Sequence, residues 1–266
     1  MMQDLSIALI QTNLHWEDIG ANLGMFEEKI WQLKSPVDLI ILPEMFNTGF
    51  SMNAHQFAEP MNSRTMKWMK QMAAQTKAVV TGSLMIKEDQ KFFNRLIWME
   101  PNGTWDQYDK KHTFKLTGEN EIYTSGDKKI IKVLKNWKVC PLICYDLRFP
   151  VWSRNRVTIN EDQILPEYDL LIYVSNWPAS RSHAWATLLK ARAIENSCYT
   201  IGSNILGKDG RGFVYEGSTL VCSPLEVLQD LKNEDTVSII NLSYEQLIDY
   251  RIKYPFLLDG DRFDLK

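Results

Sequence analysis

The sequence contains few cysteines, few histidines and no excess of positive charge. Only four cysteines occur in 266 residues, which is too few for a disulfide framework, and most lie in apolar runs typical of reduced thiols in the cytoplasm. The four histidines show no metal-ligand spacing. The net charge of −3 gives no electrostatic footprint for nucleic acid. We therefore expect no disulfide, no metal ion and no nucleic-acid partner.

Long apolar segments are also lacking. None approaches the roughly 20 residues that span a bilayer, and Met1–Ser6 lacks the basic and apolar regions of a signal peptide. At 45% hydrophobic and 24% charged residues, the composition is that of an ordinary globular protein. No linker, repeat or low-complexity segment interrupts it. We therefore expect one domain over residues 1–266, located in the cytoplasm and not associated with a membrane.

Hydrophobic periodicity predicts strands and helices along most of the chain. The expected helices are Asn22–Leu33, Ser63–Gln75, Ser182–Asn196 and Tyr244–Lys253. Expected strands are Ser6–Gln11, Asp38–Leu42, Ala78–Met85, Phe92–Glu100, Thr104–Tyr108, Lys129–Leu134, Lys138–Cys144, Asp169–Ser175, Tyr199–Ile205, Phe213–Cys222, Glu226–Leu231 and Thr236–Leu242. Helices alternate with strands in some regions, and hairpins join strands in others. This mixture favours an α/β fold with layers of helix, sheet, sheet and helix.

The segment Val139–Pro150 combines a buried-type strand with a reactive side chain. The apolar run ends at Cys144 and a polar turn follows, so we expect this thiol at the carboxyl end of a strand. There a thiolate can be partly exposed and stabilised by cations or backbone N–H groups. Cys140 lies inside the apolar run and is expected in the core. Burial is a competing interpretation for Cys144 as well, because free cysteines often pack as small hydrophobes.

Two more expected strands end at reactive side chains. Leu42-Pro43-Glu44 places a carboxylate after one strand, and the segment 108–114 places Lys110 and Lys111 after another. With Cys144, these residue types could supply a nucleophile, its base and a cation for developing negative charge. Taken alone, Glu44 is more simply explained as an ordinary carboxylate at the rim, and Lys110 and Lys111 as solvated charges. Spacing alone does not join the three sites into one.

Four motifs, taken together, resemble the nitrilase, or carbon–nitrogen hydrolase, superfamily. They are Leu42-Pro43-Glu44, Asp109–Phe114, Cys144–Pro150, and Asn176-Trp177-Pro178 followed by Lys190–Asn196. They occur in the family's order over nearly the whole chain. The resemblance implies a four-layer αββα sandwich that requires no cofactor and pairs into a homodimer. The C-terminal segment Tyr254–Leu258 is a candidate for the dimer contact.

The resemblance assigns catalytic roles to Glu44, Lys110 and Cys144. Lys110 is chosen over Lys111 because the family's lysine lies two residues before a histidine. Thr113 departs from the leucine usual in the family. The backbone N–H of Tyr145 would bind the oxyanion together with Lys110, and Lys110 would also lower the pKa of the Cys144 thiol.

Many family members carry a second glutamate after the lysine loop. Here Glu119 is the preferred candidate, with Glu121 as the alternative. It would position Lys110 or the substrate amide through hydrogen bonds.

The motifs around Cys144 and Asn176 are most similar to the omega-amidase branch. This similarity implies hydrolysis of the terminal amide of 2-oxoglutaramate or 2-oxosuccinamate through a cysteine thioester. The carboxylate end of such a substrate calls for a cation, and Arg181 is the first candidate, followed by Arg148 and Arg192. Internal ion pairs are a strong alternative role for Arg148 and Arg192. The remaining candidates for the pocket are Asn176, Trp177, Phe46 and Phe114.

Other functions remain open at this point. Within the superfamily the protein could be a different amidase, a carbamoylase or a nitrilase. A catalytically inactive binding protein on the same fold is an alternative of another class. A cysteine peptidase would need a histidine base, and neither His112 nor His183 is well placed for that role.

Overall fold

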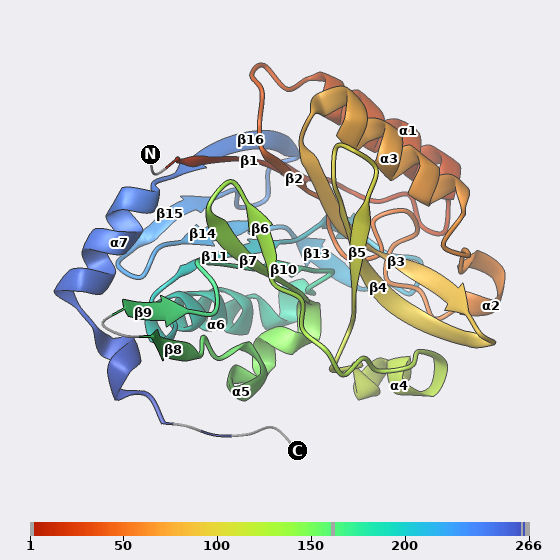
Figure 1. Cartoon of the computed structure of the whole chain (residues 1–266). Coiled ribbons are helices and arrows are strands. Elements are labelled where there is room, and N and C mark those ends of the chain that lie inside the picture. The colour runs from red at the N-terminus through yellow and green to blue at the C-terminus, as the bar shows by residue number, and fades with distance from the viewer. Residues whose placement is uncertain (1–2, 161–162, 262, 264–266) are drawn as a thin grey trace.

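Two six-stranded sheets lie face to face in the computed structural model, which describes residues 3–160, 163–261 and 263 (Figure 1). The first sheet contains β1 (Leu5–Gln11), β2 (Leu39–Ile41), β3 (Val79–Glu88), β4 (Lys91–Met99), β5 (Trp105–Asp109) and β16 (Thr236–Leu242). The second contains β6 (Lys132–Leu134), β7 (Trp137–Ile143), β10 (Leu170–Val174), β11 (Tyr199–Ser203), β14 (Leu220–Cys222) and β15 (Val227–Asp230). Their strand orders are β16-β1-β2-β3-β4-β5 and β15-β14-β11-β10-β7-β6.

Helices cover the outer faces of both sheets (Figure 1). Helices α1 (Ile19–Trp31) and α3 (Arg64–Thr76) pack on the first sheet, and α6 (Ser182–Glu195) packs on the second. The shorter or peripheral elements are α2 (Ala54–Phe57), α4 (Glu119–Ile122), α5 (Pro150–Ser153), α7 (Tyr244–Lys253) and the 3₁₀ turns η1 (Lys115–Thr117), η2 (Cys144–Arg148), η3 (Ala179–Arg181) and η4 (Phe256–Asp259). Two separate hairpins are formed by β8 (Val157–Asn160) with β9 (Gln163–Pro166) and by β12 (Leu206–Lys208) with β13 (Val214–Glu216).

The side chains of strand β1 pack alternately into two different hydrophobic layers. Leu5, Ile7 and Leu9 belong to the core between the sheets. Ala8 and Ile10, which point the other way, pack in the layer under α1 and α3. Successive side chains of a strand alternate between its faces, so a strand covered on both sides is apolar throughout. The expected αββα sandwich is confirmed.

Side-chain caps start the two helices on the first sheet. The Asp18 carboxylate accepts a hydrogen bond from the Ala21 N–H, so α1 begins at Ile19 rather than at the expected Asn22. Ser63, the first residue of the expected helix Ser63–Gln75, caps α3 in the same way.

The expected strand Phe213–Cys222 is wrong in extent. The structure divides it at Gly217 into β13, which pairs with β12, and β14, which pairs with β11. Gly217 has a φ of +72°, and a Cβ there would lie 2.5 Å from the Gln11 side chain. The chain therefore turns at a residue with no side chain and enters a different sheet. The hairpin of β8 and β9 was not predicted, and β6 begins only at Lys132.

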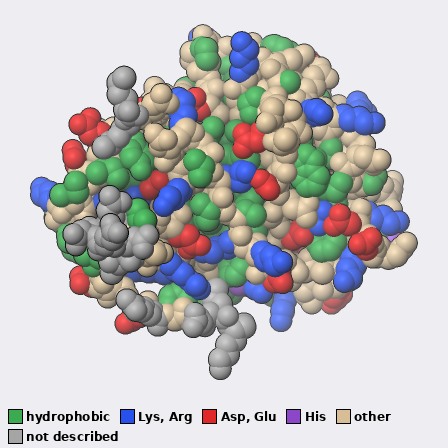
Figure 2. Space-filling model, in the orientation of Figure 1, with side chains coloured by type: hydrophobic (Ala, Val, Ile, Leu, Met, Phe, Trp, Pro, Cys, Tyr) green, Lys and Arg blue, Asp and Glu red, His purple; other side chains and the backbone are tan. Residues whose placement is uncertain are grey.

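Charges of both signs are interspersed over the face shown in Figure 2, without a large area of a single sign. No helix within the described ranges is long and apolar enough to cross a membrane.

Candidate active site

The topology brings four strand ends to one place between the sheets. In the first sheet, β2 and β5 run in the same direction, because β3 is parallel to β2 and two antiparallel pairings follow it. Glu44 lies just beyond the end of β2, and Lys110 follows β5. In the second sheet, β7 and β10 are parallel neighbours with Ile143 opposite Val174. Cys144 and Asn176 follow these two strands.

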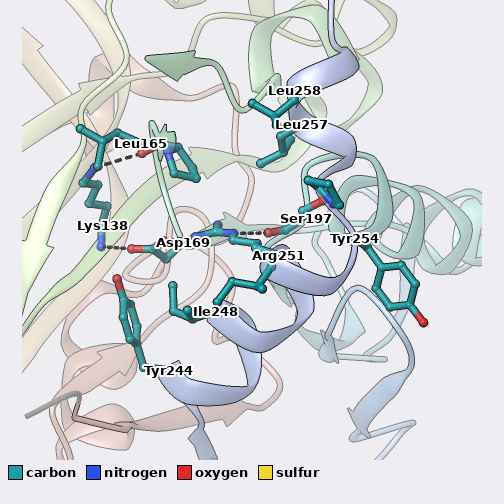
Figure 3. Close-up of a pocket in the computed structure, with 13 residues that line it drawn as sticks. Lys138, Leu165, Asp169, Ser197, Tyr244, Ile248, Arg251, Tyr254, Leu257 and Leu258 are labelled. Carbon is teal, nitrogen blue, oxygen red and sulfur yellow. Dashed lines mark hydrogen bonds and ion pairs between the residues drawn. The ribbon is translucent and has the colours of Figure 1, made fainter. Parts of the chain in front are cut away.

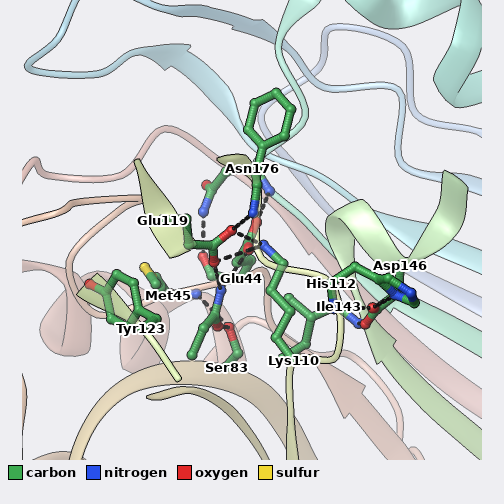
Figure 4. Close-up of polar contacts among 12 residues, drawn as sticks. Glu44, Met45, Ser83, Lys110, His112, Glu119, Tyr123, Ile143, Asp146 and Asn176 are labelled. Carbon is green, nitrogen blue, oxygen red and sulfur yellow. Dashed lines mark hydrogen bonds and ion pairs between the residues drawn. The ribbon is translucent and has the colours of Figure 1, made fainter. Parts of the chain in front are cut away.

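Lys110 lies between two buried carboxylates (Figure 4). Its Nζ is 2.8 Å from Oε1 of Glu44 and 2.9 Å from Oε2 of Glu119. Asn94 on β4 donates from its amide nitrogen to the same two glutamates, at 2.8 and 3.1 Å. The two negative charges raise the pKa of Lys110 and outweigh the lowering effect of burial. The lysine therefore stays charged although it is buried.

Glu44 also connects the two sheets. Its Oε2 accepts the backbone N–H of Asn176 at 2.9 Å, and its backbone carbonyl accepts the Asn176 side-chain amide at 2.7 Å. The next residue, Met45, has a φ of +43°, a conformation that residues other than glycine rarely adopt. Its N–H is held by the Ser83 hydroxyl at 2.9 Å. The carboxylate is thus fixed from several directions.

Cys144 is the first residue of η2 and has a φ of +39°. Such backbone strain is concentrated at functional sites, where the surroundings must maintain it. The N–H of Tyr145 lies in the first turn, where N–H groups have no acceptor within the helix. Burial and the negative charge of Glu44 raise the pKa of the Cys144 thiol well above its ordinary value. Lys110 opposes this rise in the pKa, as expected, but the net shift of the thiol's pKa is upward, opposite to the predicted one.

Asp146 holds the turn after Cys144 against the lysine loop. Its Oδ1 accepts the backbone N–H of His112 at 3.0 Å and lies 2.7 Å from Nδ1 of the same residue. Its Oδ2 accepts the Tyr108 hydroxyl at 2.7 Å and the Ile143 N–H at 3.1 Å. A stacked contact of 3.7 Å between the rings of His112 and Phe149 adds to the same junction.

One pocket contains Cys144 together with most of the expected substrate-binding residues. Glu44, Lys110, Phe114, Tyr145, Arg148, Asn176, Trp177 and Arg181 all line it. Phe46 does not: it is fully buried and packs on Phe26 and Trp68 beneath the first sheet, so its assignment to the pocket is corrected. Arg192 has the structural role considered for it, because it donates to the Leu147 carbonyl at 2.6 Å and pairs with Glu195. Glu119 occupies the position beside Lys110, whereas Glu121 is exposed.

Several residues of this site were not found from the sequence. Asn94 points inward from the middle of β4, and one amide in an alternating strand gives no signal of its own. Phe50, Arg211 and Tyr215 also line the pocket. The run from Asp209 to Gly212 indicates a turn, but nothing in it indicates where that turn is placed.

A second cavity, of about 500 Å³, lies beside α7 (Figure 3), and it shares no lining residue with the pocket of Cys144. Asp169 and Arg251 form an ion pair of 2.5 Å in its wall, and no cysteine lines it. Across the described residues, no three His, Cys, Asp or Glu side chains are grouped as a metal site.

Comparison with known proteins identifies the family. Residues 6–252 match the family model described as carbon-nitrogen hydrolase. The omega-amidase YafV of Escherichia coli (strain K12) is 40% identical over 266 residues, with 99% of this chain and 100% of the relative covered. A 2-oxoglutaramate amidase of Bacillus subtilis (strain 168) is 26% identical over 264 residues, covering 98% of each chain.

A solved structure agrees with these matches. XC1258 from Xanthomonas campestris is a CN-hydrolase superfamily protein with an arsenic adduct in its active site. It is 37% identical, covers 100% of both chains and gives a TM-score of 0.96. The chain therefore belongs to the carbon–nitrogen hydrolase family, in which it is an omega-amidase-like enzyme acting on amides.

Proposed function

We propose that this enzyme hydrolyses the terminal amide of small 2-oxo acid amides, 2-oxoglutaramate and 2-oxosuccinamate, through a thioester on Cys144. The observation that carries the proposal is the buried cluster of Lys110 with Glu44 and Glu119. Lys110 and Glu44 line one pocket with Cys144 and with arginines that form no ion pair among the described residues. The cluster suits amide chemistry, and the arginines suit a carboxylate at the far end of the substrate.

Thioester formation begins with a proton transfer. The thiol of Cys144 attacks the amide carbon as its proton passes to Glu44, which matches a resting thiol of raised pKa. The carbonyl oxygen becomes an oxyanion and accepts hydrogen bonds from Lys110 Nζ and the Tyr145 N–H. Glu44 then returns the proton to the leaving nitrogen, ammonia departs, and the acyl group remains on sulfur.

Hydrolysis repeats the same steps with water. Glu44 takes a proton from a water molecule, which attacks the thioester carbon. The second oxyanion is bound by the same donors, and its collapse releases the acid while Glu44 returns the proton to sulfur. General acid–base assistance of this kind contributes roughly 10²–10⁴-fold to rates. Glu119 contacts Lys110 and holds its Nζ in place.

Arginines and aromatic rings would recognise the other end of the substrate. Arg181 lies with its guanidinium 5.2 Å from the Phe114 ring centroid, and Arg148 lies 5.0 Å from that of Trp177. The names of the relatives, omega-amidase and 2-oxoglutaramate amidase, support this choice of substrate. Arg181 is placed first as the carboxylate ligand, with Arg148 second and Asn176 available to the reacting amide.

A panel of substrates tests the proposal. Ammonia release should be measured from 2-oxoglutaramate, 2-oxosuccinamate, a carbamoyl amino acid and a nitrile, with Cys144→Ala as the matched inactive control. We expect the highest kcat/KM for the two 2-oxo acid amides, and an acyl adduct on Cys144 by mass spectrometry after acid quench. A clear preference for the carbamoyl compound or the nitrile would reject the substrate assignment. Turnover by Cys144→Ala would reject the mechanism.

We also propose that the enzyme works as a homodimer in the cytoplasm, with the segment Tyr254–Leu258 in the contact. Phe256 and Leu258 are exposed at 57% and 43%, and Tyr254 stacks on Phe256. Exposed apolar side chains grouped in this way are typical of an interaction surface. Sedimentation of the wild type and of Phe256→Ser tests the contact, and a monomeric wild type would reject it.

A further inference from the structure

Three arginines surround the mouth of the catalytic pocket. Arg148, Arg181 and Arg211 all line it, and each guanidinium lies near an aromatic ring rather than a carboxylate. Arg211 is 5.1 Å from the Phe213 ring centroid and 5.9 Å from that of Phe50. None of the three forms an ion pair within the part of the chain that the structure describes. Their positive charge is therefore available to a ligand.

Arg211 reaches the pocket from the turn between β12 and β13, and this turn is held in place. Oδ1 of Asp209 accepts the N–H groups of Arg211 and Phe213, both at 2.9 Å, and Oδ2 accepts the Tyr215 hydroxyl at 3.0 Å. The nearby carboxylate thus binds the turn without forming an ion pair with the guanidinium. Gly210 lies so close to Trp16 that a Cβ would come within 2.2 Å of its Nε1. The turn is therefore packed closely against Trp16.

The same pocket has no free carboxylate, among the described residues that line it, to bind a positively charged group of a ligand. Among the described residues that line it, Glu44 is the one acidic side chain, and Lys110 and Asn176 already bind both of its oxygens. A carboxylate or a 2-oxo group at the mouth would meet guanidinium donors. A 2-ammonium group would meet like charges and no acceptor carboxylate, which is unfavourable.

We propose that Arg211 is a specificity-determining residue that binds the carboxylate end of a 2-oxo acid amide together with Arg181 and disfavours the corresponding 2-amino acid amide. The inference rests on the proposed function and deepens it. It explains how a site that hydrolyses the amide of 2-oxoglutaramate would discriminate against glutamine, which has the same length and the same amide. The two compounds differ only at the carbon next to the carboxylate.

The test compares three substrates and three proteins. The substrates are 2-oxoglutaramate, glutamine and pentanamide, a neutral amide of the same chain length. Arg211→Gln is compared with the wild type and with Lys208→Gln, which removes a cation from the same hairpin but outside this pocket. We expect Arg211→Gln to lower kcat/KM for 2-oxoglutaramate about 10–100-fold, mainly through KM, the loss typical of one hydrogen bond to a charged group.

The other measurements should separate specificity from a structural effect. Pentanamide should lose much less activity than 2-oxoglutaramate in Arg211→Gln, and Lys208→Gln should behave as wild type. Arg211→Glu should also raise the ratio of glutamine to 2-oxoglutaramate turnover. An equal loss on 2-oxoglutaramate and pentanamide, or the same loss in Lys208→Gln, would overturn the proposal.

A binding assay distinguishes failure of this inference from failure of the proposed function. Alkylation of Cys144 by iodoacetamide should be slowed by 2-oxoglutarate in the wild type, and a higher concentration should be needed in Arg211→Gln. If the wild type hydrolyses no 2-oxo acid amide but shows this difference, the proposed reaction fails while Arg211 remains a carboxylate ligand. Equal protection of both proteins would reject the role of Arg211 whatever the substrate is.

Discussion

The Tyr108 hydroxyl donates a hydrogen bond of 2.7 Å to Oδ2 of Asp146, and this contact joins the two sheets next to the catalytic cluster. Tyr108 lies in β5, directly before the loop of Lys110, whereas Asp146 lies in the turn that Cys144 begins. The same hydroxyl accepts hydrogen bonds from Trp152 Nε1 at 3.0 Å and the Lys111 N–H at 3.2 Å. A buried hydrogen-bond network therefore joins the turn that begins at Cys144 to the loop that carries Lys110.

Tyr108→Phe should weaken both stability and catalysis. Removing the hydroxyl leaves the Trp152 N–H without its acceptor and Asp146 with one donor fewer, at a cost of about 1–3 kcal/mol in the free energy of unfolding. Small displacements of catalytic groups can reduce rates about 10²-fold, so kcat should fall by about one order of magnitude. Urea denaturation and steady-state kinetics measure the two effects. An unchanged kcat in a destabilised variant would show that the network serves stability alone.

Replacing Cys144 and Cys140 in turn separates chemistry from packing. Cys144→Ala should abolish amide hydrolysis and retain the circular dichroism spectrum of the wild type, because Cys144 is partly exposed at a strand end. Cys140 is fully buried in β7, so Cys140→Ala should lower the free energy of unfolding by about 1–2 kcal/mol. The folded fraction of that variant should turn over normally. Near-normal activity in Cys144→Ala would contradict the assigned nucleophile.

Two neighbouring glutamates offer a matched comparison. Glu119→Gln removes one of the two charges beside Lys110 and weakens a hydrogen-bonded cluster, so kcat should fall about 10–100-fold, in the range seen when oxyanion-site groups are disturbed. Glu121→Gln changes an exposed side chain of the same short helix and should leave kcat unchanged. Ammonia release under saturating substrate measures both variants. A greater loss in Glu121→Gln would reverse the assignment.

Stability should decline in alkali because of buried thiols. Burial raises the pKa of Cys140 to about 12, compared with 9.0 for an ordinary thiol. Below pH 9, the pKa of the thiol in the unfolded chain, Cys140 is protonated in both states and the free energy of unfolding does not change. As the pH rises from about 9 toward 12, the thiol ionises only in the unfolded chain, so the free energy of unfolding falls. Between about pH 8 and about pH 10.5, Cys140 alone should lower the free energy of unfolding by about 2 kcal/mol. Urea unfolding in the presence of a reductant should show a smaller loss over this interval in Cys140→Ala. Equal losses in the two proteins would assign the alkaline effect to other groups.

The layered fold could be predicted because each layer leaves a pattern in the sequence. Helical periodicity indicated α1, α3 and α6, and continuous apolar runs indicated the strands covered on both sides. The turn-forming residues Pro101-Asn102-Gly103 lie between the two expected strands of the β4–β5 hairpin. The predicted boundaries were wrong where a single residue sets them, as at Asp18 and Gly217. Asp18 caps a helix, and Gly217 lies against the distant Gln11 side chain. Hydrophobic periodicity reports neither a cap nor a close contact of this kind.

The site could be predicted in part, and only through its motifs. Glu44, Lys110 and Cys144 each follow an apolar strand, but spacing does not show that these strand ends meet. Asn94 was missed because its place beside the glutamates depends on the pairing of β4 with β3. Arg211 was missed because its place at the pocket depends on where the β12–β13 hairpin packs. Phe46 was misplaced because an aromatic residue two positions after a glutamate can face the core as readily as the pocket.

The pairing of β16 with β1 has a consequence for synthesis on the ribosome. Every residue assigned to catalysis or substrate binding precedes position 236, yet β16 (Thr236–Leu242) pairs with Leu5–Gln11 over seven register positions. A nascent chain that already contains the proposed nucleophile Cys144, the proposed base Glu44 and Lys110 therefore still lacks the edge strand of the sheet that carries Glu44 and Lys110. The enzyme becomes complete only when the last strand reaches the first, so amide hydrolysis should appear only in chains that have passed this strand.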